Sequence, residues 1–266
     1  MLTEQRNPRT TDIDRLSTLD MLRLMNEEDA RVAEGVHQAL PDIARAVNAI
    51  VERLQAGGRL IYAGAGTSGR LAMLDAVECV PTFSAPPDLV QALIAGGEPA
   101  LTRSVEGAED DDDAGRRDLL GLRPETRDAI VGLAASGNTP YVVGVVRAAR
   151  ELGCLTIAIS CNSPAAILDQ ADIGIIVPVG PEVITGSTRL KAGTAQKMVL
   201  NMLSTASMIH LGKVYSNLMV EVKVSNRKLL HRAQRIVAEL TGVDSEKALE
   251  LLEQADYEPK AAVVMG

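Results

Sequence analysis

The sequence has very few aromatic residues, and this scarcity limits both the core and the ligands it can hold. Trp is absent, Phe occurs once, and aromatics make up 2% of 266 residues, whereas hydrophobic residues reach 46%. The core must therefore consist of small aliphatic side chains, which suits a sheet packed between helices. So few rings also argue against a base-stacking surface for single-stranded nucleic acid.

Basic residues are outnumbered by acidic ones. The chain has 27 Lys and Arg against 35 Asp and Glu, a net charge of −8. It lacks the clustered basic surplus that a nucleic-acid surface requires, so we expect no nucleic-acid partner. An anionic ligand would need a local binding device, because the overall charge repels it.

Cysteine is rare, and long apolar runs are missing. The odd count of Cys79, Cys154 and Cys161, without metal-ligand spacing, indicates reduced thiols of a cytoplasmic protein. No run approaches the roughly 18 apolar residues of a membrane span, and the polar N-terminus lacks the apolar core of a secretory signal. We expect a cytoplasmic protein with no membrane partner, no metal and no organic cofactor.

Short apolar runs alternate with amphipathic segments through the middle of the chain. The expected strands are 59–64, 89–96, 128–135, 154–160 and 172–179. Because these runs are continuously apolar, they are typical of parallel strands covered on both faces. The pattern predicts an α/β fold, a three-layer doubly wound parallel sheet of about five strands.

Helical periodicity flanks this sheet. We expect an N-terminal arm and helices over 1–56, a main domain over 57–225 and a small C-terminal helical bundle over 226–266. A long helix with one apolar stripe is predicted at 189–212.

Two hydroxyl-rich turns stand between predicted strands and helices. The first, GAGTSGR at 64–70, offers Gly66, Thr67 and Ser68 at a helix N-terminus, where backbone amides attract anions. Its glycines also fit a dinucleotide GxGxxG, which alone is a weak signal and lacks the expected ribose-binding acid about twenty residues on. A purely structural tight turn is a further alternative.

The second turn, AASGNTP at 134–140, offers Ser136, Gly137, Asn138 and Thr139. Taken alone, it could be an ordinary threonine helix cap. Two such turns at the carboxyl edge of one sheet favour a phosphorylated ligand held by neutral hydroxyls and amides.

Together these motifs carry a family resemblance. The pairing of GTSGR with ASGNTP resembles the SIS (sugar isomerase) domain, so 57–225 would be a sugar-phosphate domain. The longer matches, RLIYAGAGTSGRLAMLDAVEC, VEGAED, TGSTRLKAGTAQKMVLNMLSTASM and the N-terminal TEQRN, resemble the N-acetylmuramic acid 6-phosphate etherase family. VECVP departs from the more usual SECPP, and we expect the C-terminal bundle to be shorter than in the family.

The resemblance implies an activity on a phosphorylated amino sugar. Members cleave the D-lactyl ether of N-acetylmuramic acid 6-phosphate by elimination and water addition, giving N-acetylglucosamine 6-phosphate and D-lactate in cell-wall recycling. It also implies a homodimer with shared active sites. Two other functions are open: a sugar-phosphate isomerase, and a non-catalytic regulatory protein that responds to sugar phosphates.

The family pattern places the catalytic acid at Glu78 and the base at Glu109. Two carboxyl groups in different environments can divide these tasks. Glu78 would lie roughly 15 Å along its helix from the phosphate turn. A partner subunit's phosphate site, or a bend in the chain, could bring Glu78 and a bound phosphate together. Glu109 adjoins an acidic run that resembles a solvated loop, and Glu106 or Asp75 could substitute.

The segment STRLKAG at 187–193 has two interpretations. Ser187, Arg189 and Lys191 could close over substrate or contact a second subunit. Alternatively, they form a helix cap with surface charges.

Overall fold

Five short parallel strands form the sheet in a computed structural model of the chain, which describes residues 1–224 and 226–266. The strands are β1 (Leu60–Gly64), β2 (Val90–Ile94), β3 (Ala129–Leu133), β4 (Leu155–Ser160) and β5 (Ile173–Ile176). Their order is β2-β1-β3-β4-β5, with every pair parallel. The prediction of a doubly wound parallel sheet is confirmed.

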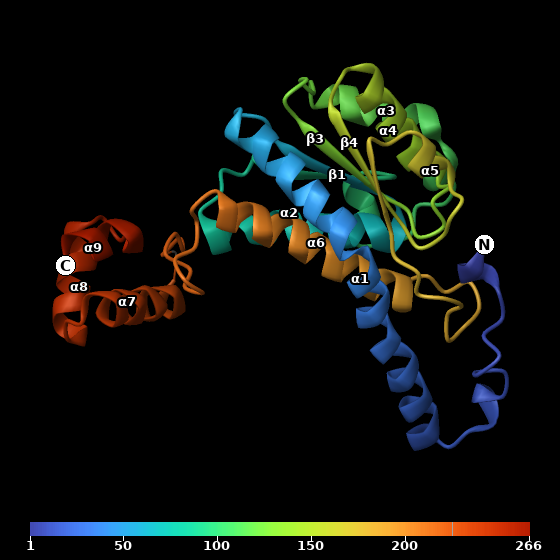
Figure 1. Cartoon of the computed structure of the whole chain (residues 1–266), viewed down its shortest axis with the longest axis horizontal. Helices are drawn as coiled ribbons and strands as arrows, with labels where there is room; N and C mark the ends of the chain where they lie inside the picture. Colours follow the sequence, from blue (N-terminus) through green and yellow to red (C-terminus); the bar gives the residue numbers. More distant parts are fainter. Residues whose placement is uncertain (225) are drawn as a thin grey trace.

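Helices cover both faces of this sheet (Figure 1). One face carries α1 (Thr18–Gln55), α2 (Gly66–Phe83) and α6 (Lys191–His210); the other carries α3 (Asp112–Gly121), α4 (Pro140–Glu151) and α5 (Ala166–Asp169). Alternate strand residues serve the two cores: in β3, Val131 belongs to the α1 side and Ile130 to the α4 side. Burial on both faces explains why the strands lack polar alternation.

The acidic run after Glu109 is largely exposed to solvent, as expected, but it is not a loop throughout, because Asp112 and Asp113 begin α3. The Asp111 carboxylate accepts a hydrogen bond from the Ala114 backbone N–H at 2.8 Å and caps α3. Asp112 and Asp113 then occupy the first turn, where negative charge stabilises a helix.

Helix α2 is longer than its predicted range of 68–79. It continues through Pro81 to Phe83 and ends at Ser84, which adopts a left-handed conformation. Glu78 therefore lies within the helix rather than at its end.

The N-terminal arm packs onto the body of the protein instead of extending into solvent. It contains two short 3₁₀ turns, η1 (Leu2–Glu4) and η2 (Ile13–Arg15), and buries Thr3, Asn7 and Thr10. Figure 1 shows the arm running from the free end of α1 back to the loop before α6.

The C-terminal helices stand apart from the sheet in Figure 1. They are α7 (Arg227–Thr241), α8 (Ser245–Gln254) and α9 (Pro259–Met265), and they share a small core of their own. The predicted helical bundle is thus confirmed, while its predicted boundary at Ser225 lies outside the described residues. Within the two described ranges, no helix is both long and apolar enough to cross a membrane.

Candidate active site

The two hydroxyl-rich turns meet at one edge of the sheet. β1 and β3 are neighbours, and their last residues, Gly64 and Leu133, are register partners. The chain leaves β1 toward one face through α2 and leaves β3 toward the other through α4, so a crevice opens between the turns. A cavity of about 330 Å³ lies there and is lined by residues of both turns.

The first turn presents donors to this cavity. Gly66 has φ +52° and nothing near the position a Cβ would take, so the backbone is open to a ligand. The α2 N-cap, Ala65, makes no side-chain cap bond, which leaves the first amides of the helix without a capping side chain. Thr67 and Ser68 also line the cavity, and the Ser68 hydroxyl donates to Gln196 Oε1 at 2.8 Å.

The other glycines of GxGxxG serve strand–helix packing. A Cβ on Gly64 would lie 2.6 Å from the Gly69 nitrogen, and a Cβ on Gly69 would lie 2.6 Å from Ile94 Cγ1. Contacts this short exclude any larger residue, so the motif follows from the close approach of β1 and α2 without a dinucleotide.

The second turn divides its residues between lining the cavity and shaping the loop. Ser136 and Thr139 line the cavity; Thr139 is the N-cap of α4 but makes no side-chain cap bond, so it does not act as an ordinary threonine cap. Gly137 is buried at φ +74°, and a Cβ there would meet Ala165 at 2.3 Å. The Asn138 side chain also lines the cavity, but its amide donates to the Ser136 carbonyl at 3.2 Å and its Oδ1 accepts from the Ala166 N–H at 2.9 Å.

Glu109 lies at the same cavity, on the short turn η4 (Ala108–Asp110) that follows Gly107. Asp110 and Glu4 also line it, whereas Glu106 does not. Among the described lining residues there is no Lys, Arg or His. An anion in this cavity would therefore depend on amides, hydroxyls and helix N-termini.

Glu78 lies elsewhere in the subunit. It lines a second hollow of about 250 Å³ between α2 and α6, beside Asp75 and Lys197. Twelve residues separate it from Gly66, which is about 18 Å along a helix axis. The structure does not bring Glu78 and Glu109 into one cavity within a single chain.

Asp75, the alternative acid on α2, is committed to internal hydrogen bonds. Tyr62 donates to Asp75 Oδ2 at 2.9 Å, and Ser204 donates to Asp75 Oδ1 at 3.1 Å. Burial raises the pKa of Asp75 above its ordinary value, and these two hydrogen bonds offset only part of that effect. Its contacts fix α2 against β1 and α6.

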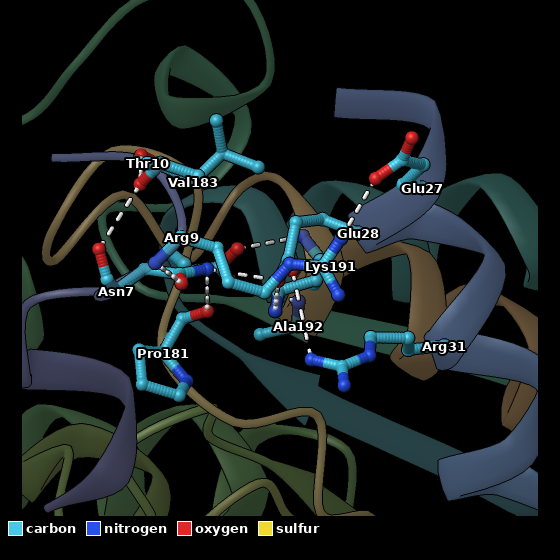
Figure 2. Close-up of polar contacts among 11 residues, drawn as sticks. Asn7, Arg9, Thr10, Glu27, Glu28, Arg31, Pro181, Val183, Lys191 and Ala192 are labelled. Carbon is cyan, nitrogen blue, oxygen red and sulfur yellow. Dashed lines mark hydrogen bonds and ion pairs between the residues drawn. The ribbon is translucent and has the colours of Figure 1, made fainter. Parts of the chain in front are cut away.

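Lys191 is not a surface charge, and Figure 2 shows why. It is 1% exposed, and its Nζ donates to Glu28 Oε2 at 2.7 Å. Asn7 donates to the same oxygen at 2.8 Å, and Arg9 Nε lies 3.1 Å from Glu28 Oε1. Burial alone would raise the pKa of Glu28, but the hydrogen bonds from Lys191 and Asn7 and the positive charges nearby lower it overall.

The same network fixes the loop before α6. Buried Glu182 accepts hydrogen bonds from the backbone N–H groups of Lys191 and Ala192, both at 2.9 Å, and so caps the helix. Thr188, within the predicted STRLKAG segment, lines the cavity, whereas Ser187, Arg189 and Lys191 do not. The sequence interpretation missed Thr188 and Glu4, because only the folded loop and arm bring them to the turns.

Neither the cysteines nor the metal-ligating side chains of the described ranges form a second site, as their burial and grouping show. Cys79, Cys154 and Cys161 are buried free thiols. Over the same part of the chain, no group of three or more His, Cys, Asp and Glu side chains could hold a metal ion.

Family models match three parts of the chain. The model of the glucokinase regulatory protein N-terminal SIS domain matches residues 42–150, and the SIS domain model matches 119–206. The model of the C-terminal lid domain of glucokinase regulatory protein matches 216–264. The two SIS matches cover the whole sheet and both hydroxyl-rich turns.

Curated relatives match over the full length of the chain. The N-acetylmuramic acid 6-phosphate etherases of Salmonella agona and Salmonella typhi are each 56% identical over 266 residues, which is 100% of this chain and 90% of each relative.

Solved structures support the fold at lower identity. A phosphoheptose isomerase from Francisella tularensis aligns with a TM-score of 0.59 and 21% identity, covering 73% of this chain and 100% of its own. The Vibrio vulnificus NanR protein complexed with ManNAc-6P aligns with a TM-score of 0.52 and 10% identity, covering 74% of this chain and 66% of its own.

Proposed function

Because the chain belongs to the N-acetylmuramic acid 6-phosphate etherase family, we propose that it cleaves the D-lactyl ether of that sugar phosphate. The products are N-acetylglucosamine 6-phosphate and D-lactate, and the setting is the recycling of cell-wall amino sugars in the cytoplasm. The observation that carries the proposal is the cavity between β1 and β3, with uncapped helix N-termini and hydroxyls beside Glu109.

This cavity suits a phosphate monoester. Thr67, Ser136 and Thr139 bring neutral hydroxyls to the N-termini of α2 and α4, where helix dipoles favour negative charge. Ser68 lies in the first turn of α2, but its hydroxyl donates to Gln196 Oε1. Gly137 and Asn138 hold the second turn in shape. The phosphate would sit against these turns, and the sugar would extend toward Glu109.

The reaction needs a base and an acid. In the open-chain sugar, carbon 2 lies next to the aldehyde, so its proton can be removed by the Glu109 carboxylate. The electron pair forms the carbon 2–carbon 3 double bond as the ether oxygen leaves carbon 3 and takes a proton from Glu78. Water then adds to carbon 3, and carbon 2 recovers a proton, which regenerates the saturated sugar.

A homodimer would bring Glu78 to a neighbouring cavity. Glu78 lies on an outer face of α2 that exposes Leu74 and Val77, which are 49% and 57% accessible to solvent. A second subunit covering this face would bury those side chains. It would also enclose Glu78 between the two subunits, beside the cavity of the second one.

The experiment is an assay of D-lactate released from N-acetylmuramic acid 6-phosphate by the purified chain. Glu109→Gln should lower the rate by about 10²- to 10⁴-fold, the usual contribution of a general acid or base. Glu106→Gln is the matched control, since Glu106 is exposed, three residues away and outside the cavity lining. No lactate from the wild type, or equal rates for the two variants, would refute the assignment.

The regulatory alternative draws on the two matches to models named for glucokinase regulatory protein. Those models cover segments of the chain, whereas the etherase relatives align with all of it at 56% identity. We therefore favour the etherase. The division into 1–56, 57–225 and 226–266 also remains our proposal.

A further inference from the structure

The N-terminal arm contributes an uncommitted carboxylate to the cavity. Glu4 lines the cavity together with both hydroxyl-rich turns. Its side chain makes no hydrogen bond or ion pair to any other described residue, so both carboxylate oxygens are available to a ligand. Its Oε2 lies 3.2 Å from where a Cβ on Gly186 would stand, so the carboxylate lies against the loop that carries Thr188.

The arm is held firmly enough to give Glu4 a defined place. Next to Glu4, buried Thr3 accepts a hydrogen bond from the Asn162 amide at 3.0 Å, and the Thr3 N–H donates to Asn162 Oδ1 at 3.3 Å. The Asn162 amide also donates to the Ala135 carbonyl at 2.8 Å, one residue before Ser136. The arm is therefore tied directly to the second turn.

Two further contacts anchor the arm farther along. The Thr10 hydroxyl donates to the Val183 carbonyl at 2.8 Å, and Asn7 joins the buried Glu28 (Figure 2). Because these bonds are buried, loss of the arm would leave polar groups unsatisfied. The protein thus orders a polar segment across its cavity and leaves the Glu4 carboxylate of that segment without a partner among the described residues.

A carboxylate at this place discriminates between parts of a ligand. It repels a phosphate group, and it accepts hydrogen bonds from neutral O–H or N–H groups. The turn hydroxyls and helix N-termini have the opposite preference. A ligand with an anionic group at one end and neutral O–H or N–H donors elsewhere can bind the turns through its anion and the carboxylate through its donors.

We propose that Glu4 is a substrate-binding residue that accepts a hydrogen bond from a hydroxyl or amide N–H of the bound amino sugar. This proposal rests on the proposed function for the class of ligand. It makes the N-terminal arm a wall of the site, and Glu4 fixes the orientation of the sugar while the turns hold its phosphate.

The test measures binding of two probes by calorimetry, inorganic phosphate and N-acetylglucosamine 6-phosphate. Glu4→Ala should weaken the sugar phosphate by about 10- to 100-fold, the range for a hydrogen bond to a charged group. Inorganic phosphate should bind as well as before or more tightly, because a negative charge has been removed. Glu4→Gln, which keeps an acceptor oxygen, should fall between wild type and Glu4→Ala.

Asp12→Asn is the matched control, because Asp12 is an exposed acid on the same arm that does not line the cavity. It should leave both affinities unchanged. Equal weakening of both probes in Glu4→Ala would mean that the residue only supports the fold, and unchanged sugar-phosphate binding would mean that it does not touch the ligand. Either result overturns the proposal.

Failure of the proposed function would look different. The wild-type chain would release no D-lactate from N-acetylmuramic acid 6-phosphate, whatever the two binding constants. The calorimetric contrast between the probes does not depend on turnover, so it judges Glu4 separately.

Discussion

Replacing Glu28 with glutamine should destabilise the chain more than replacing its partner Lys191 with methionine. The two side chains form an ion pair in which each is 1% exposed. Their other contacts are unequal: Glu28 also meets Asn7, Arg9 and Arg31, whereas Glu28 is the one acceptor of the Lys191 ammonium among the described residues. The asymmetry sets the expected magnitudes.

Glu28→Gln leaves a buried ammonium without a countercharge, which costs about 3–5 kcal/mol of the free energy of unfolding. Lys191→Met removes that charge, and the Glu28 carboxylate keeps its amide and arginine partners. We therefore expect a loss of about 1–2 kcal/mol from the missing hydrogen bond. The double variant should resemble Lys191→Met, so the coupling energy between the two sites should equal the cost of Glu28→Gln in size, about 3–5 kcal/mol.

The assay is equilibrium urea unfolding of the wild type, both single variants and the double variant. Similar m-values with shifted midpoints would show that stability alone has changed. A cost below about 1 kcal/mol for Glu28→Gln, or a larger cost for Lys191→Met, would refute this account of the pair.

Three further predictions follow from the described contacts. The stability advantage of the wild type over Glu28→Gln should be fully present above pH 4.5, the ordinary pKa of Glu28. It should shrink as the pH falls through the lowered pKa of Glu28 in the folded chain, and urea unfolding at decreasing pH would measure this loss. Burial raises the pKa of Cys79 to about 12, so alkylation of Cys79 at neutral pH, followed by mass spectrometry, should be slow until the chain unfolds. Thr139→Val should weaken the binding of inorganic phosphate by about tenfold, because a hydroxyl donor to the phosphate is lost. The stability of the chain should not change, because this hydroxyl makes no cap bond to α4; unchanged phosphate binding would remove Thr139 from the phosphate site.

Local sequence patterns were sufficient to predict the strands of the sheet and the two hydroxyl-rich turns. Each strand is a short apolar run, and the turns after β1 and β3 carry their glycines and hydroxyls within a few residues, so their positions follow from nearby sequence. The acidic run misled the interpretation in part, because Asp111 is both a charged residue and a good helix cap.

Long-range contacts explain what could not be predicted. The Glu28–Lys191 pair joins residues 163 positions apart, and Glu4 reaches the cavity only through the arm's bonds to Asn162. No local pattern encodes either. Glu78 was picked out by family resemblance, but its separation from Glu109 within one subunit depends on the direction of α2.

The proposed function rests on the claim that Glu78 of one subunit and Glu109 of another act on the same substrate. The direct measurement is D-lactate release after Glu78→Gln and Glu109→Gln chains, each nearly inactive alone, are unfolded together and refolded. Random pairing makes half of the dimers mixed, and each mixed dimer has one intact site of two, so activity should recover to about one quarter of wild type. Recovery to no more than the activity of the separate variants would contradict the claim.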